Sequence, residues 1–446
     1  MALVVNSAID LFRDIGVSSA VIQKRELTEP CLSSIFWLNA SLGVALTGLV
    51  WFLSPWVSQF YREPRLGPVL AAIAPVSFIA GLGLVHRSLL ERDLKFQALA
   101  KTEMISTLAA SIISIWAASV GFGVWSLVIQ SLTNATLSVS MAWLATRWRP
   151  SKHFRWSDIR PLAKFSIGLV GFNFCNFCSR NADYLLIGRF LGARELGFYT
   201  MAYRLMLYPL NNISAVMGRI MFPVLAQIHG DLTRFRRGYL AAIGSIALVS
   251  FPMMTGLMVT ADLFVPVVLG YQWKPVVPLI QILASIGLIQ SIGTTVGSIY
   301  QAKARTDLLL KWGLLSGTLA VLSFVIGLNW GTIGVASAYA LLSVLLTVPN
   351  FLIPFRLIGL ELSEFASHLW RPLVCSLIMG GGVLSIRLVL DGWCCPPREA
   401  LVLSIVSGLV VYCVLSWGIN RASIQQSFEV AGASFLLKAR GAKLRV

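Results

Sequence analysis

Charged residues are scarce in this chain. Only 12% of its 446 residues are Asp, Glu, Lys or Arg, whereas 57% are apolar. A soluble chain of this length would form about three domains, with roughly a quarter of their residues charged. The shortage of charge excludes a soluble globular protein. It leaves a polytopic membrane protein, whose apolar residues face lipid.

Residues that commonly build metal sites or disulfide frameworks are few and scattered. The chain has four His and seven Cys, which form no zinc-ribbon spacing and no disulfide framework. Cys175 and Cys178 form a CxxC inside an apolar stretch, where small apolar packing explains them. A P-loop is also absent, which argues against ATP hydrolysis by this chain. The sequence therefore predicts no metal site and no cofactor.

Long apolar runs dominate the chain. A transmembrane helix needs about 20 mostly apolar residues to cross about 30 Å of hydrocarbon. Twelve stretches meet this requirement, at approximately 36–56, 67–86, 104–120, 122–145, 165–187, 196–227, 239–259, 276–300, 308–327, 332–355, 372–390 and 399–418. Residues 1–21 look like a further, short helix. We expect an all-α membrane protein with 12 full spans plus a partial N-terminal one.

Lys and Arg are distributed unevenly between the connections of these spans. Alternate connections hold 25 of the 36 Lys and Arg residues, and the opposite connections hold six. Cytoplasmic loops of membrane proteins carry such an excess of Lys and Arg. We therefore place the basic connections and the C-terminus in the cytoplasm. The net charge of +17 is a topology signal, and nucleic-acid binding is not expected.

The longest basic connection, at 147–164, divides the chain into two halves that echo each other. GFGVWSLVIQ at 121–130 corresponds to WGTIGVASAYA at 330–340, about 210 residues later. Parallel repeats of this kind are a transporter architecture, with the substrate path between the halves. The predicted parts are an N-terminal lobe (1–146), a basic cytoplasmic linker (147–164), a C-terminal lobe (165–356), two additional helices (357–418) and a basic cytoplasmic tail (419–446).

The comparison of the two halves also indicates a difference between them. The helix at 165–187 and the segment FLGARELGFY at 190–199 have no counterpart in the first half. We therefore expect a chain that lacks its first helix. An intact version would have fourteen helices.

Five segments carry a resemblance to a known family. They are LFRDIGVSSAVIQKRELTE (11–29), IFWLN (35–39), LLERDLKF (89–96), SRNADYLLIGRFLGARELGFYTMAYRLMLYPLNNIS (179–214) and ARTDLLL (304–310). These segments resemble the Wzx-type polysaccharide and O-antigen flippases of the multidrug/oligosaccharidyl-lipid/polysaccharide exporter superfamily. The similarity covers about residues 10–359.

The resemblance implies a fold and a function. The fold is two helical lobes around a central cavity, followed by two C-terminal helices. The function is movement of undecaprenyl-pyrophosphate-linked oligosaccharide from the cytoplasmic to the outer leaflet of the bacterial inner membrane, for lipopolysaccharide or exopolysaccharide synthesis. We expect alternating access without enzymatic activity. The resemblance favours a monomer, and it allows a coupling ion and polysaccharide polymerase machinery as further partners.

Two of the predicted spans carry polar residues along one face. An ionisable residue at mid-bilayer costs on the order of 3 kcal/mol, so it usually faces a cavity or a partner. The span at 165–187 carries Asn173, Asn176, Arg180 and Asp183, and the span at 196–227 carries Arg204, Tyr208, Asn211 and Arg219. Arginine binds phosphate bidentately, and Asn and Tyr pair with glycan hydroxyls. These eight residues are the predicted substrate-binding cavity.

Structural roles for the same residues stay open. Arg180 and Asp183, three positions apart, can neutralise each other as an ion pair within one helix. Arg204 and Arg219 can extend their charged ends to the two membrane surfaces. The sequence does not decide which arginines face the cavity.

Three other functions compete with the flippase hypothesis. A drug exporter of the same superfamily would prefer buried acids where this chain has arginines. An inactive truncated flippase would follow from the absent first helix. A membrane enzyme of the same pathway generally needs a large outer loop or paired carboxylates, but the longest predicted outer loop, 260–275, holds one acid, Asp262.

Overall fold

The computed structural model describes residues 29–155, 181–214 and 231–419, apart from residues 94, 304, 393 and 394. These residues form helices and contain no strand, so the predicted all-α class is confirmed for them. The chain divides into two compact units, Met1–Ala193 and Arg194–Val446. The predicted partial helix at 1–21 lies outside the described residues, as do 165–180 and 215–227 of two predicted spans.

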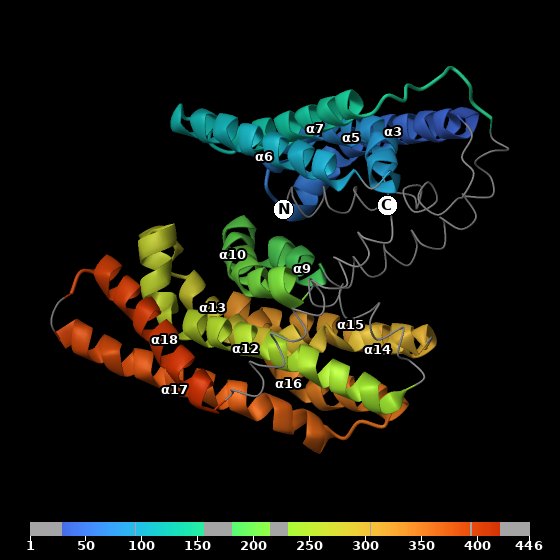
Figure 1. The fold of residues 1–446 in the computed structure, drawn as a ribbon. Helices are drawn as coiled ribbons and strands as arrows, with labels where there is room; N and C mark the ends of the chain where they lie inside the picture. The colour runs from blue at the N-terminus through green and yellow to red at the C-terminus, as the bar shows by residue number, and fades with distance from the viewer. Residues whose placement is uncertain are drawn as a thin grey trace. The chain divides into compact units, whose positions relative to one another are not determined.

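The first unit is built from three long helices and several shorter ones (Figure 1). They are α3 (Glu29–Tyr61), α4 (Leu66–Ile73), α5 (Pro75–Arg92), α6 (Phe96–Ser119), α7 (Trp125–Ala145) and α9 (Ala182–Phe190). Helices α4 and α5 meet at Ala74, because Pro75 has no N–H and starts a new helix readily. Helix α7 packs against both α5 and α6.

The second unit contains the remaining described helices (Figure 1). They are α10 (Ala193–Pro209), η1 (Leu210–Ser214), α12 (Leu232–Phe264), η2 (Val265–Leu269), η3 (Tyr271–Trp273), α13 (Val276–Gly293), α14 (Val296–Ala302), α15 (Thr306–Gly327), η4 (Leu328–Trp330), α16 (Gly331–Ile358), α17 (Leu362–Gly392) and α18 (Pro397–Ile419). Aromatic rings fill its core at one end, where Phe351, Phe355 and Phe365 pack with centroids 4.7–5.7 Å apart. Helices α17 and α18, the predicted additional pair, pack on each other and on α12.

Nine helical stretches of the described residues are long and apolar enough to cross a membrane. One of them, Asp307–Ile358, has 52 residues and would measure about 78 Å if it were a straight helix. It is instead the hairpin of α15 and α16, because Trp312 Nε1 donates to Asn350 Oδ1 at 2.8 Å and the rings of Phe324 and Tyr339 lie 5.3 Å apart. The protein is a multi-pass membrane protein.

The turn of this hairpin requires glycine at two positions. Gly331 has a φ of 71°, a left-handed conformation that favours glycine. A Cβ on Gly327 would lie 2.6 Å from the carbonyl oxygen of Gly334. The two helices therefore approach each other backbone to backbone at this end.

Two connections 210 residues apart share the same backbone hydrogen bonds. In the first unit, the N–H of Lys95 donates to the carbonyl of Leu90 at 2.9 Å. In the second unit, the N–H of Arg305 donates to the carbonyl of Tyr300 at 2.8 Å. The end of α5 and the end of α14 are therefore closed by the same hydrogen bond before α6 and α15 begin.

The beginning of the predicted basic linker is hydrogen-bonded to α3. Trp37 Nε1 donates to the carbonyl of Ser151 at 2.8 Å, and the N–H of Ser151 donates to Ser33 Oγ at 3.0 Å. The N–H of Arg155 donates to Ser34 Oγ at 3.1 Å. Residues 146–155 are therefore an ordered part of the first unit, although they contain no helix. The linker residues 156–164 lie outside the described residues.

Candidate functional site

The predicted polar residues of the span at 165–187 are only partly described. Asn173, Asn176 and Arg180 lie outside the described residues, so the proposed Arg180–Asp183 ion pair stays a prediction. Asp183 lies in the first turn of α9 and is buried, with 1% of its surface exposed. Its Oδ1 accepts a hydrogen bond from the N–H of Tyr184 at 2.8 Å. Asp183 therefore interacts with the start of its own helix.

The predicted polar face, on α10 and the start of η1, is exposed. Arg204, Tyr208 and Asn211 are all exposed, and Tyr208 keeps 65% of its surface accessible. Tyr199 and Met206, on the other face of α10, are fully buried in the second unit. The sequence pattern thus separated the two faces correctly, because residues three and four positions apart share one face of a helix. Arg219 lies outside the described residues.

A proline shapes the end of this polar face. The α-helix α10 ends at Pro209, and the π-helical turn η1 continues from Leu210. Asn212 Nδ2 donates to the carbonyl of Tyr208 at 2.8 Å. Asn212 is exposed beside Asn211 and was missed by sequence analysis, which followed only every third or fourth position.

The two predicted stripes belong to different units. Asp183 is part of the first unit and Arg204 of the second. The substrate-binding cavity that these two sets of polar residues predict together stays a prediction.

The first unit contains a polar cleft that sequence analysis did not predict. Its volume is about 310 Å³, and its walls come from α5, α6 and α7. The polar side chains that line it are Arg87, Thr102, Glu103, Ser131, Asn134 and Ser138. All six lie outside the polar stripes predicted from the sequence. We name this space the α5–α7 cleft.

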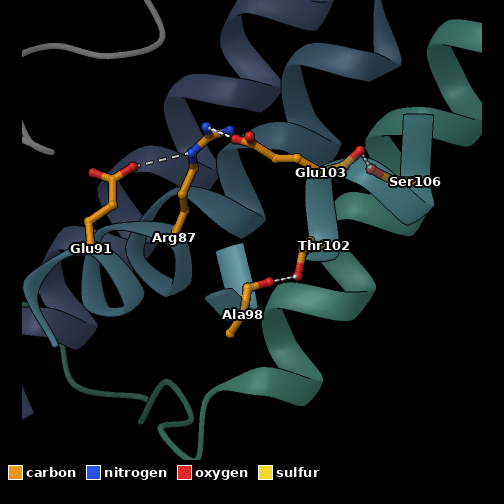
Figure 2. A network of polar contacts seen from close by, with 6 residues as sticks. All are labelled: Arg87, Glu91, Ala98, Thr102, Glu103 and Ser106. Atoms are coloured by element: carbon orange, nitrogen blue, oxygen red, sulfur yellow. Dashed lines mark hydrogen bonds and ion pairs between the residues drawn. The ribbon is translucent and has the colours of Figure 1, made fainter. Parts of the chain in front are cut away.

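An ion-pair network lies along one end of the α5–α7 cleft (Figure 2). The guanidinium of Arg87 on α5 contacts the Oε1 of Glu103 on α6, and its Nε lies 3.4 Å from Glu91 Oε1. The side chains of Arg87 and Glu103 keep 50% and 48% of their surface exposed. Because both are exposed, the network lies at the mouth of the cleft.

The other polar side chains that line the α5–α7 cleft carry hydroxyl and amide groups. Ser131 Oγ donates to the carbonyl of Leu127 at 2.9 Å, and Thr102 Oγ1 donates to the carbonyl of Ala98 at 2.9 Å. The Oδ1 of Asn134 is buried and accepts no hydrogen bond from any residue that the structure describes. A sequence signal was available, because Ser131, Asn134 and Ser138 follow each other at helical spacing within the predicted span at 122–145.

The described residues offer no cluster of His, Cys, Asp and Glu that could hold a metal ion. Two polar regions are candidates: the exposed face of α10 and η1 in the second unit, and the α5–α7 cleft in the first unit.

A protein-family model described as polysaccharide biosynthesis protein matches residues 1–278, which is more than half of the chain. The chain belongs to this family. The resemblance to Wzx-type flippases that was expected from the sequence is confirmed by this match and by relatives along most of the chain.

Three relatives illustrate the similarity. The lipopolysaccharide biosynthesis protein WzxC of Escherichia coli (strain K12) is 26% identical over 84% of this chain and 77% of its own length. The teichuronic acid biosynthesis protein TuaB of Bacillus subtilis (strain 168) is 29% identical over 90% of this chain and 84% of its own. The succinoglycan biosynthesis transport protein ExoT of Rhizobium meliloti (strain 1021) is 26% identical over 97% of this chain and 88% of its own.

A solved structure shares the fold. The lipid II flippase MurJ, in an inward closed conformation, matches 94% of this chain and 90% of its own with a TM-score of 0.71. Its sequence is 18% identical to this chain, so the match describes the fold alone.

Proposed function

We propose that this protein is a flippase that moves undecaprenyl-pyrophosphate-linked oligosaccharide from the cytoplasmic to the outer leaflet of the bacterial inner membrane. The observation that carries the proposal is the polar face formed by α10 and the start of η1, where Arg204, Tyr208 and Asn211 are all exposed. Because the chain belongs to a polysaccharide biosynthesis family, the substrate proposed for this face is a glycan intermediate. The transport protein ExoT and the flippase fold of MurJ support translocation rather than catalysis.

The chemistry of the polar face suits such a substrate. A lipid pyrophosphate carries negative charge, which the planar guanidinium of Arg204 can bind through two parallel hydrogen bonds. Tyr208 and Asn211 supply a hydroxyl and an amide for sugar hydroxyls. Five further residues predicted from the sequence belong to this proposal. They are Asp183, and Asn173, Asn176, Arg180 and Arg219, which lie outside the described residues.

The transport cycle in this proposal is alternating access by two lobes. The equivalent hydrogen bonds at Lys95 and Arg305, 210 residues apart, support the predicted parallel repeat. In a repeat transporter, the lobes rock around a substrate site between them. The predicted lobes, 1–146 and 165–356, the cytoplasmic C-terminus, the monomeric state, a coupling ion and polymerase partners are parts of this proposal.

The proposal is tested by deleting the gene and measuring undecaprenyl-pyrophosphate-linked glycan on the inner leaflet. Deletion should make the intermediate accumulate, and the wild-type chain should clear it. Arg204→Ala should clear it at least about tenfold more slowly, because an arginine–phosphate contact is worth about 1.5–3 kcal/mol. Arg194→Ala is the matched control, because Arg194 lies at the start of the same helix with its guanidinium over the ring of Phe198.

One outcome would contradict the proposal. If deletion leaves the intermediate unchanged in a strain without a second flippase, the lipid-linked glycan is not the substrate. The drug exporter of the same superfamily would then become the leading hypothesis.

A further inference from the structure

The α5–α7 cleft extends from the mouth into the membrane-spanning part of the first unit. Its lining runs along α5 from Arg87 to Val76 and along α7 from Ala142 to Ser131. Eleven positions of an α-helix correspond to about 16 Å. The cleft is therefore long enough to hold an elongated polar group between helices whose outer surfaces are apolar.

The charge at the mouth disfavours one class of ligand. Arg87 is the one basic residue among the described residues that line the cleft, and it faces two carboxylates, Glu91 and Glu103. Figure 2 shows its guanidinium between them. The arginine is thus already neutralised, and the remaining negative charge repels phosphate. This charge balance favours a ligand without phosphate.

The hydrogen-bonding groups inside the cleft indicate what the ligand must supply. The hydroxyls of Ser131 and Thr102 donate their hydrogens to carbonyls of their own helices. Their oxygens can therefore only accept hydrogen bonds from a ligand in the cleft. The Oδ1 of Asn134 is a third acceptor without a partner among the described residues. A buried acceptor without a hydrogen bond costs about 1–3 kcal/mol. A ligand rich in O–H donors would satisfy all three.

We propose that the α5–α7 cleft binds uncharged, polyhydroxylated sugar units of the lipid-linked glycan at the cytoplasmic side. This inference rests on the proposed function and adds to it a second contact, separate from the pyrophosphate contact at Arg204. The volume of about 310 Å³ lies at the lower end of small-molecule sites, so the cleft holds part of a glycan rather than a whole oligosaccharide.

The test compares two lipids on the purified full chain in nanodiscs. One probe is undecaprenyl pyrophosphate, and the other is the same lipid carrying the glycan, isolated from cells in which transport is blocked. The wild type should bind the glycan-bearing lipid more tightly. Ser138→Leu, which fills the cleft with an apolar side chain, should remove that preference, and binding of the bare lipid should stay unchanged.

Matched variants separate a lost contact from a damaged fold. Ser140→Leu is the control for Ser138→Leu, because Ser140 is exposed on the same helix and does not line the cleft. Asn134→Ala removes an acceptor without filling the cleft and should lower the preference about fivefold, as expected for one hydrogen bond of about 1 kcal/mol. Arg204→Ala should weaken the binding of both lipids to the same extent.

The outcomes distinguish the two proposals. If Ser138→Leu and Asn134→Ala keep the wild-type preference for the glycan, the cleft does not bind sugar, and the inference is wrong. If the wild type binds neither lipid better than phosphatidylglycerol, the proposed function itself fails.

Discussion

Arg387 on α17 forms a bidentate ion pair with Asp262 on α12. Its Nη1 donates to Asp262 Oδ1 at 2.8 Å and its Nη2 donates to Oδ2 at 2.5 Å, and Nη1 also donates to the carbonyl of Val259 at 2.8 Å. The same separation of 125 residues relates Gly380 and Thr255, where a Cβ on the glycine would lie 2.8 Å from Thr255 Cγ2. The two helices therefore run parallel and in register, and the ion pair holds α17 against α12 within the second unit.

Asp262→Ala should destabilise this attachment. The Arg387 side chain is only 14% exposed, so removing the carboxylate leaves a largely buried guanidinium without a counter-charge. We expect a loss of about 2 kcal/mol, in the range of hydrogen bonds to charged groups. Thermal unfolding in detergent measures it. Arg371→Ala, on the same helix and outside any described ion pair, is the control, and equal effects of the two variants would contradict a stabilising ion pair.

Gly327→Ala should destabilise the α15–α16 hairpin. The added Cβ would meet the backbone of Gly334 at 2.6 Å, and backbone cannot move aside as a flexible side chain can. Overpacking of this kind costs about 1–3 kcal/mol. Gly313→Ala is the matched control in the same helix, because nothing lies within 4 Å of its added Cβ. Unfolding midpoints of the two variants should move in opposite directions, since an open helical glycine gains about 0.5–1 kcal/mol on replacement by alanine.

Trp37→Phe should loosen the connection at 146–155. The substitution removes the hydrogen bond from Trp37 Nε1 to the carbonyl of Ser151 and keeps an aromatic ring. A lost hydrogen bond of about 1 kcal/mol should raise the open population of this connection about fivefold. Limited trypsin digestion at Arg147 and Lys152 measures the change, because cleavage follows the open population when opening is fast. Trp51→Phe, at an exposed position of the same helix, should digest like the wild type.

Arg204→Lys should show whether Arg204 binds phosphate through two parallel hydrogen bonds or through its positive charge alone. Lysine keeps the positive charge but cannot form two parallel hydrogen bonds with a phosphate. If Arg204 binds the pyrophosphate bidentately, clearance of the lipid-linked intermediate should fall to a rate between those of wild type and Arg204→Ala. A rate equal to that of the wild type would show that charge alone suffices at this position.

The sequence by itself determined the class of protein and one polar helix face. Apolar runs of about 20 residues have no stable alternative to a helix in lipid, because every backbone N–H and C=O must be paired within the segment. Helical spacing then placed Arg204, Tyr208 and Asn211 on one side, and all three are exposed, the first two on α10 and Asn211 on η1. The long segment at 179–214 also indicated the family, because its resemblance does not depend on hydrophobicity.

The tertiary structure decided which residues meet across helices. Arg87 and Glu103 are 16 positions apart, Asp262 and Arg387 are 125 apart, and Ser33 and Ser151 are 118 apart. Each contact depends on which helix faces which neighbour, and hydrophobic periodicity says nothing about that choice, because lipid and a neighbouring helix are equally apolar. The α5–α7 cleft exists for the same reason: three helices leave a space between them that no single helix contains.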